Sequence, residues 1–358
     1  MDINMNKFAV LIIVVALLLS GCGILHTVMT ETGVVESQTE QTISESAQTT
    51  LQPAEATTHV PDVTSQTATE TTTRETEYIT TETEYSITLK RDILVLMIAY
   101  PDYVAGVEMI ENEACLVMRS GKRILYDDKK TKTFDEKITD ADIQDMLETI
   151  YPLTEINALM STDVDPGRSR AYSFFEEIYG DSKAVISKKL VSVDFGDEHL
   201  PFNKEAGAAA ALASAAVGAA GLVIDQPQIV DYLYPTSGTF NYRVIAGTNR
   251  LSPHAFGIAI DLRSSPDGYW RWASPAEGEK LIKKYPQDLV RLFEKNGFIW
   301  GGKWNHFDLF HFEYRPEIII KAKYFAEEID ITKPWYQGTN FACESVSEII
   351  AQIDRSLG

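Results

Sequence analysis

Apolar residues are distributed unevenly along the chain. An uncharged apolar run spans residues 8–19, and a stretch with few large apolar side chains extends from residue 23 to residue 85. Only from residue 86 onwards do apolar positions recur in the patterns of secondary structure. Residues 86–358 are enough for one large domain or two small ones, and the folded part of the protein is expected there.

The first patterned segments predict β-structure. Residues 87–98 are rich in Ile, Leu and Val, which predicts a strand. Residues 115–118 and 124–126 flank a Ser-Gly turn, and together they predict a β-hairpin. We therefore expect a strand-rich N-terminal extension over residues 86–150.

Helices and a further strand are expected next. Apolar residues recur at helical spacing over residues 140–151, and Pro152 ends that helix. The pattern also predicts a helix over residues 171–179 and a strand over residues 190–195.

One uncharged segment, residues 206–224, allows two interpretations. Its length alone would suffice for a membrane span. Its content, however, is mostly Ala and Gly, which are weakly hydrophobic and favour close packing of a helix inside a globule. We therefore expect a buried helix.

The polar stretch over residues 23–85 is strongly acidic. Residues 23–85 hold ten Glu and one Asp against one Arg, a net charge of −10, which is half of the −20 of the whole chain. Few apolar side chains and like charges leave too little burial to offset chain entropy, so a disordered tether is expected. The acidic balance argues against nucleic acid as a partner, because phosphate binding needs a basic surface.

The N-terminus indicates a compartment. The apolar run is preceded by a basic residue and closes in Ser20-Gly21-Cys22, so residues 1–22 are typical of a secretory signal. This end resembles the lipobox of bacterial lipoproteins, in which the cysteine is lipidated, and the alternative is an uncleaved signal anchor. Either way, the rest of the chain is expected outside the cytoplasm, anchored to the membrane.

The other cysteines leave a choice open. After Cys22 only Cys115 and Cys343 remain. An oxidising compartment permits a disulfide between them, and two separate buried thiols are equally compatible with the sequence.

The candidate chemistry lies in two blocks, S-x-H-x-x-G-x-A-x-D over residues 252–261 and D-x-x-H-F-E over residues 308–313. Zinc takes His nitrogen and carboxylate oxygen, and a catalytic site uses three protein ligands and leaves a fourth position open. His254, Asp261 and His311 supply such a set. The chain has six histidines, and two others, His199 and His306, are interpreted as ordinary surface or core residues.

Geometry sets a condition on this ligand set. Seven residues of straight strand would put His254 and Asp261 about 23 Å apart, at ~3.3 Å per residue. Both reach one metal only if the chain bends between them, and Pro253 and Gly257 are the residues that permit a bend. Beyond it, the alternation predicts a buried apolar face made by Ile258, Ile260 and Leu262.

The two blocks resemble those of the zinc D-Ala-D-Ala carboxypeptidases, a family that includes vancomycin-resistance peptidases and L-alanyl-D-glutamate endopeptidases. The resemblance implies that His254, Asp261 and His311 hold Zn²⁺. It also implies that Asp308 is the general base and that Arg243 binds the substrate carbonyl or its oxyanion. Arg250 is the competing arginine.

Other residues near the two blocks have a functional and a structural interpretation. Ser252 either contacts the substrate or serves as a turn residue before Pro253. Glu313 either orients a ligand or forms a surface salt bridge. Arg168, with Asp165 and Arg170, either recognises a substrate carboxylate or fixes a loop through an ion pair. The segment from Asp165 to Arg168 also resembles one found in the endopeptidase-like branch.

Taken together, the sequence predicts an α+β fold in which an antiparallel sheet with packed helices carries a single zinc site. The zinc peptidase domain is expected over residues 151–340 and a C-terminal helix over 341–358. The implied substrate is the stem peptide of peptidoglycan, cut by a D,D-carboxypeptidase or by an endopeptidase. The alternative is a non-catalytic, zinc-containing cell-wall-binding module of the same fold.

Overall fold

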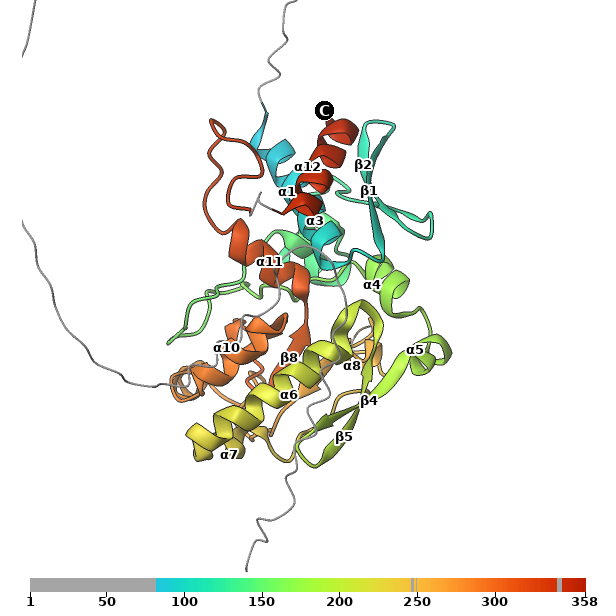
Figure 1. Ribbon diagram of the computed structural model, residues 1–358. Helices are drawn as coiled ribbons and strands as arrows, with labels where there is room; N and C mark the ends of the chain where they lie inside the picture. The colour runs from blue at the N-terminus through green and yellow to red at the C-terminus, as the bar shows by residue number, and fades with distance from the viewer. Residues whose placement is uncertain (1–81, 246–247, 249, 340–342) are drawn as a thin grey trace, which may run out of the picture. The chain divides into compact units, whose positions relative to one another are not determined.

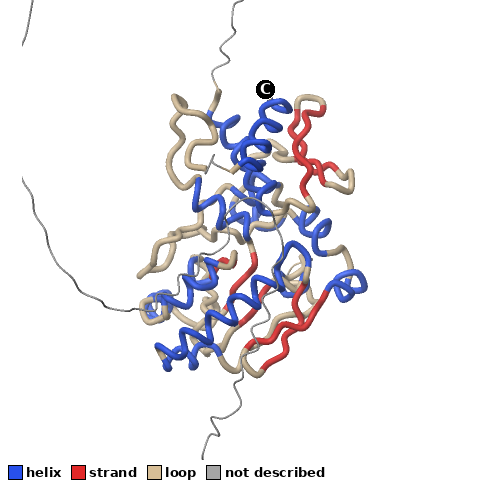
Figure 2. Tube along the Cα trace, in the orientation of Figure 1, coloured by secondary structure: helices blue, strands red, loops and turns tan. Residues whose placement is uncertain are grey.

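The structure is a computed structural model that describes residues 82–358 except 246–247, 249 and 340–342 (Figure 1). The predicted signal segment with Cys22, and the predicted tether as far as residue 81, lie outside the described residues. Figure 2 shows that helices and small sheets are both present, which confirms the α+β class.

A helix, α1 (Glu84–Ala99), occupies the segment for which the sequence predicted a strand, and it includes the expected end of the tether. Thr83 caps the helix, because its side-chain oxygen accepts a hydrogen bond from the backbone N–H of Ser86. Most residues of α1 are buried, on all sides of the helix. The strand prediction was therefore wrong. A continuous apolar run shows no alternation of apolar and polar residues, so its sequence pattern cannot distinguish a buried helix from a buried strand.

The rest of the N-terminal region is a three-stranded antiparallel sheet followed by two short helices. Its elements are β1 (Val104–Ile110), β2 (Glu113–Met118), β3 (Arg123–Leu125), α2 (Phe134–Thr139) and α3 (Ile143–Leu147). The pairing of β2 with β3 confirms the predicted hairpin. The helix predicted over residues 140–151 is shorter than expected and is limited to α3.

The two ends of the folded part pack together. Helix α1 contacts both α11 (Pro316–Tyr324) and α12 (Glu344–Leu357), as Figure 1 shows. Cys115 in β2 is a free thiol, so the disulfide with Cys343 that the sequence left open is not formed.

The middle of the chain forms a hairpin covered by helices. Its elements are α4 (Tyr172–Tyr179), α5 (Lys183–Lys189), β4 (Leu190–Phe195), β5 (Glu198–Asn203), α6 (Ala208–Asp225) and α7 (Val230–Leu233), with short 3-10 turns at Glu205–Gly207 and Pro227–Ile229. Helix α4 and strand β4 lie where the sequence predicted them.

Helix α6 is the uncharged segment, and it is buried on one face only. It is long and apolar enough to cross a membrane by length and composition, yet it packs against β4 and α10 (Gln287–Lys295). Leu212 and Ala215 are fully buried, whereas Val217 and Ile224 are 76% and 80% exposed. The prediction of a buried helix therefore holds for one side of α6 and was wrong for the other.

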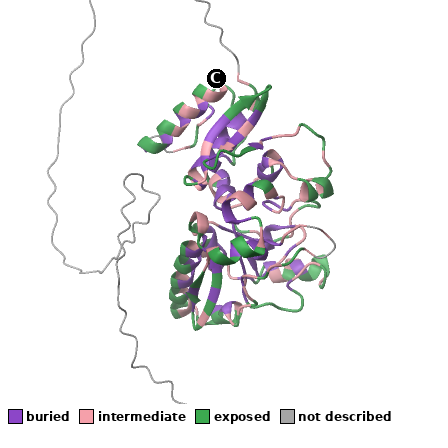
Figure 3. Cartoon of the chain, turned by 90° about the vertical axis from the view of Figure 1, so that its right-hand side faces the viewer, coloured by how far each residue is buried: buried purple, intermediate pink, exposed green. Residues whose placement is uncertain are grey.

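The C-terminal half contains the sheet that carries the candidate site. The remaining elements are α8 (Pro253–Phe256), β6 (Ala259–Asp261), α9 (Pro275–Ile282), β7 (Phe298–Trp300), a 3-10 turn at Gly301–Lys303 and β8 (His311–Tyr314). The strands pair antiparallel in the order β6-β8-β7. Ile258, Ile260 and Leu262 are fully buried, as their alternation predicted. Figure 3 shows that buried residues gather in the interior of the described part and that the outer sides of the helices are exposed.

Gly257 ends α8 in the left-handed region, with φ at 70°, and it supplies the bend that the sequence required. Replacement of Gly257 by Ala forces a side chain into this conformation, and its Cβ would lie 2.7 Å from Cδ2 of Leu190. We expect Gly257→Ala to lower the free energy of unfolding by about 1–2 kcal/mol, measured by urea denaturation.

Gly221 provides the matched control, because it lies inside α6 and an added Cβ would meet nothing within 4 Å. Gly221→Ala should leave the stability unchanged or raise it by ~0.5–1 kcal/mol. Equal urea midpoints for wild type and Gly257→Ala would show that the bend does not depend on glycine.

Candidate metal centre

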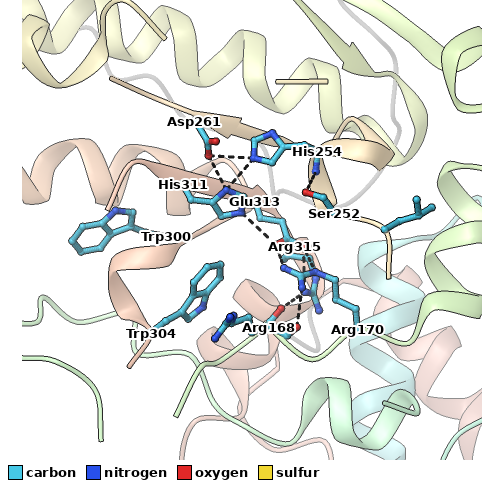
Figure 4. A network of polar contacts seen from close by, with 12 residues as sticks. Arg168, Arg170, Ser252, His254, Asp261, Trp300, Trp304, His311, Glu313 and Arg315 are labelled. Carbon is cyan, nitrogen blue, oxygen red and sulfur yellow. Dashed lines mark hydrogen bonds and ion pairs between the residues drawn. The ribbon is translucent and has the colours of Figure 1, made fainter. Parts of the chain in front are cut away.

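The register of the sheet brings two candidate ligands together. Asp261 is the last residue of β6 and His311 the first of β8, and the two are direct cross-strand partners. Side chains in such positions have Cβ atoms about 4.5–5.5 Å apart and point to the same face of the sheet. Oδ1 of Asp261 lies 2.9 Å from Nδ1 of His311 (Figure 4).

The third ligand reaches this point through the predicted bend. Pro253 begins the one-turn helix α8 and Gly257 ends it, so the chain turns back before it enters β6. As a result, Nε2 of His254 lies 3.2 Å from Oδ1 of Asp261 and 3.2 Å from Nδ1 of His311. Both imidazoles are buried.

Neighbouring groups fix which nitrogen of each imidazole faces the centre. Nδ1 of His254 lies 2.6 Å from the carbonyl oxygen of Thr239 and donates to it, which leaves the lone pair of Nε2 for a metal. Nε2 of His311 faces the carboxylate of Glu313 at 3.7 Å, which leaves Nδ1 for the centre. Two nitrogen lone pairs and the Asp261 carboxylate therefore converge on one point.

The residues present fit a zinc ion. Tetrahedral ligands at ~2.0–2.1 Å from zinc lie roughly 3.3 Å from one another. The three ligand atoms are separated by 2.9, 3.2 and 3.2 Å, which is close to that spacing. Two imidazole nitrogens and one carboxylate oxygen are also a donor set that zinc prefers.

Glu313 is itself held by a buried arginine. Nε of Arg170 donates to Oε1 of Glu313 at 2.8 Å, and Nη2 donates to Oε2. Burial raises the pKa of Glu313, but the charge and hydrogen bonds of Arg170 outweigh it and hold that pKa below its usual range. Glu313 is thus a buried anion that orients His311, and it is not part of a surface salt bridge.

The described site residues line one cavity of about 130 Å³ above the three candidate ligands. Asp308, Arg243, Ser252 and Arg168 all contribute to its wall. The structure therefore brings together every predicted site residue except Cys22, which lies outside the described residues.

Asp308 has the properties of a proton acceptor. Burial raises its pKa to about 7, while the charges of His311 and Asp261 act on that pKa in opposite directions. Its Oδ1 is buried and has no hydrogen-bond partner within the described part of the chain. A carboxyl group that lines the cavity, with its pKa raised by burial, is suited to take a proton from water.

The structure also shows where Arg250, Arg243 and Ser252 lie relative to the cavity. Nη1 of Arg250 donates to the carbonyl oxygen of Ile138, and Arg250 does not line the cavity, so Arg243 is the better placed arginine. Ser252 lines the cavity, and its Oγ accepts from the backbone N–H of His254 at 3.3 Å, as expected of a turn residue before Pro253.

The sequence interpretation missed His306. It lines the cavity, and its Nδ1 lies 2.8 Å from Oδ2 of Asp165. Its place two residues before Asp308, just ahead of the second block, was the signal that could have identified it. His199, by contrast, is exposed and pairs with Asp194, as the sequence suggested.

Comparison with known proteins agrees with this geometry. Residues 246–314 match the model of a family described as D-alanyl-D-alanine carboxypeptidase. The match includes the three candidate ligands and Asp308, and it confirms the resemblance noted from the sequence. No curated protein and no solved structure matches the chain.

Zinc binding should release a proton. In the metal-free site burial lowers the pKa of His311, but Asp261 and Glu313 raise it more strongly, to about 10. His311 is therefore protonated at pH 7.5 and must lose that proton to bind zinc. Calorimetry in two buffers of different ionisation enthalpy should show one zinc and close to one proton released, with affinity falling as pH falls. His254→Ala should lose tight zinc binding, and tight binding without proton release in the wild type would contradict this site.

Proposed function

Because residues 246–314 match the model of a family described as D-alanyl-D-alanine carboxypeptidase, we propose that this protein is a zinc peptidase that hydrolyses the stem peptides of peptidoglycan. The zinc ion would be held by His254, Asp261 and His311. One observation carries the proposal, namely that Asp308 lines the same cavity as these ligands and that its Oδ1 has no hydrogen-bond partner among the described residues.

Zinc supplies a Lewis acid that polarises a carbonyl group and lowers the pKa of water. The chain supplies the proton transfers. Asp308 takes a proton from the attacking water and delivers it to the nitrogen of the leaving amine. The carboxylate that accepts the proton in the first step can release it in the second, so one side chain serves both steps.

Arg243 supplies a positive charge at the rim of the cavity. It is exposed and lines the cavity together with Asp308. A guanidinium group in this place stabilises the negative charge that develops on the carbonyl oxygen. Ser252 offers a hydroxyl group to the backbone of the bound peptide.

The main alternative is a zinc-containing module that binds the cell wall without cutting it. The position of Asp308 favours an enzyme, because a purely structural zinc site does not need a buried carboxyl group with a free oxygen beside the ligands. Stoichiometric zinc with no cleavage of any wall substrate would favour the binding module.

Asp308→Asn should slow cleavage strongly and retain zinc. Loss of a general base reduces kcat by about 10²–10⁴-fold, measured on purified peptidoglycan by mass spectrometry of the released products. Asp231→Asn, which changes an exposed aspartate paired with Arg263 outside the cavity, is the matched control and should cleave normally. Cleavage by Asp308→Asn at the wild-type rate would contradict the assignment of the base.

The pH dependence follows from the same group. The base acts when deprotonated, so kcat/KM of the wild type should fall as pH drops through the pKa of Asp308. Zinc lowers this pKa further from the metal-free value of about 7, which puts the acid limb below pH 7. An unchanged acid limb in the residual activity of Asp308→Asn would assign that limb to another group.

The N-terminal residues support a location outside the cytoplasm. We propose that Cys22 is lipidated and that residues 23–81 tether the enzyme to the membrane, where it meets peptidoglycan directly. Cys22→Ser should move the protein from the membrane fraction to the soluble fraction of the cell envelope, measured by immunoblotting. Firm membrane retention of Cys22→Ser would favour the uncleaved signal anchor.

A further inference from the structure

A second cavity is separate from the candidate metal centre and lies between α1 and the connection from α11 to α12. Its volume is about 390 Å³, within the ~300–1,000 Å³ of most ligand pockets. Arg91 of α1 lines it together with residues from the segment 323–338, which runs beside α1 in Figure 1. None of these described lining residues belongs to the first cavity or to the segment that matches the family model.

Arg91 is a buried cation at the wall of this second cavity. The residue is 8% exposed, and its Nε donates to the carbonyl oxygen of Trp335 at 2.7 Å. Its Nη1 and Nη2 have no hydrogen-bond partner in the part of the chain that the structure describes. Since buried charges in proteins are normally paired and hydrogen-bonded, the free Nη groups indicate an anion in the cavity.

The adjacent carboxylate does not balance the charge of Arg91. Asp92 is engaged elsewhere, because its Oδ1 pairs with Nζ of Lys321 at 2.6 Å and its Oδ2 accepts from the hydroxyl group of Tyr126 at 2.9 Å. Burial lowers the pKa of Arg91, and the charge of Asp92 offsets that effect only in part. The positive charge of Arg91 is therefore left without a full counterion within the described residues.

The wall around Arg91 is held from two sides. Trp335 accepts from Arg91 of α1 through its carbonyl oxygen, and its Nε1 donates to Oδ1 of Asp354 in α12 at 2.8 Å. The guanidinium group of Arg91 also lies 4.9 Å from the ring centre of Phe325. The donors of Arg91 are thus fixed before a ligand binds, which lowers the entropic cost of binding.

The rim of the second cavity carries charges of both signs. Lys333 pairs with Asp330 at 3.1 Å, so these two charges balance each other. Glu327, Glu328 and Lys323 are exposed and form no ion pair with any described residue, so solvent screens their charges. A charge acts most strongly where water is excluded, and the buried charge of the cavity is that of Arg91.

We propose that the second cavity binds a small ligand through an oxyanion, a phosphate or carboxylate group that Nη1 and Nη2 of Arg91 hold. The planar fork of a guanidinium group matches the two oxygens of such a group and forms charge-assisted hydrogen bonds with them. The volume of about 390 Å³ leaves room for further atoms of the ligand beside the oxyanion. This site is independent of the proposed peptidase activity and would stand or fall without it.

The test follows amide hydrogen exchange of residues 323–338 by mass spectrometry in the zinc-loaded full-length protein. Inorganic phosphate and acetate are titrated separately at constant ionic strength, and the probe with the lower midpoint identifies the preferred oxyanion. This readout is local, because phosphate bound at the zinc would not contact the segment. Exchange should slow in the wild type, and Arg91→Gln should raise the midpoint at least about tenfold, because a charge-assisted hydrogen bond is lost.

Arg119→Gln is the matched control. Nε of Arg119 also donates to a backbone carbonyl oxygen, that of Pro101 at 2.7 Å, but Arg119 is exposed and does not line the cavity. Its midpoint should equal that of the wild type.

Substitutions at the rim test the sign of the charge while Arg91 stays in place. Ala326 is exposed and lines the cavity. Ala326→Glu should raise the midpoint by about 2- to 4-fold, whereas Ala326→Gln, which has the same size and no charge, should not. Glu328→Gln removes a negative charge from the rim and should lower the midpoint.

Three results would overturn the proposal. The first is that neither probe slows exchange of residues 323–338, and the second is that Arg91→Gln keeps the wild-type midpoint. If Arg91→Gln fails to fold, the rim variants decide, and equal midpoints for Ala326→Glu and Ala326→Gln would be the third.

Discussion

Three electron-pair donors that meet in a buried space need a shared cation, and the arrangement of the candidate site depends on this requirement. Thr239 and Glu313 direct one nitrogen of each imidazole away from the centre, so the other nitrogen of each faces Asp261. Without a cation, the two lone pairs and the carboxylate would repel one another at separations of 2.9–3.2 Å. A proton on His311 meets the need in the metal-free protein, and a zinc ion held by the same three residues would also meet it.

The fold supports this centre through a small number of buried contacts. The pairing of β6 with β8 sets Asp261 opposite His311, and the left-handed Gly257 returns His254 to the same point. Behind them, Arg170 holds Glu313 in a pair whose separation would cost about 3–5 kcal/mol, because the remaining charge would stay buried alone. The cluster of the candidate ligands is therefore built into the core and does not depend on mobile surface loops.

The sequence was informative wherever the deciding contacts are local. The candidate ligands lie in two short sequence blocks. The bend between His254 and Asp261 could be predicted from Pro253 and Gly257, because the backbone preferences of proline and glycine do not depend on distant contacts. The hairpin of β2 and β3 was predictable for the same reason, since its turn and its partners are adjacent in the chain.

The remaining features depend on contacts between residues far apart in the chain, which no local sequence pattern predicts. Arg170 and Glu313 are 143 residues apart, and Asp165 and His306 are 141 apart, so neither pairing could be deduced from spacing. Helix α1 was taken for a strand because it is buried on all sides and shows no amphipathic period. The composition of α6 likewise could not predict that one of its sides is exposed, because Ala and Gly occur both in protein interiors and at surfaces.

X-ray absorption at the zinc edge of the loaded protein tests the central claim most directly, because it reports the atoms bound to the metal. The account predicts two imidazole nitrogens at ~2.0–2.1 Å and carboxylate or water oxygen at ~2.0–2.2 Å. Sulfur at ~2.3 Å, or a shell of oxygen atoms without imidazole, would place the zinc elsewhere and contradict the account.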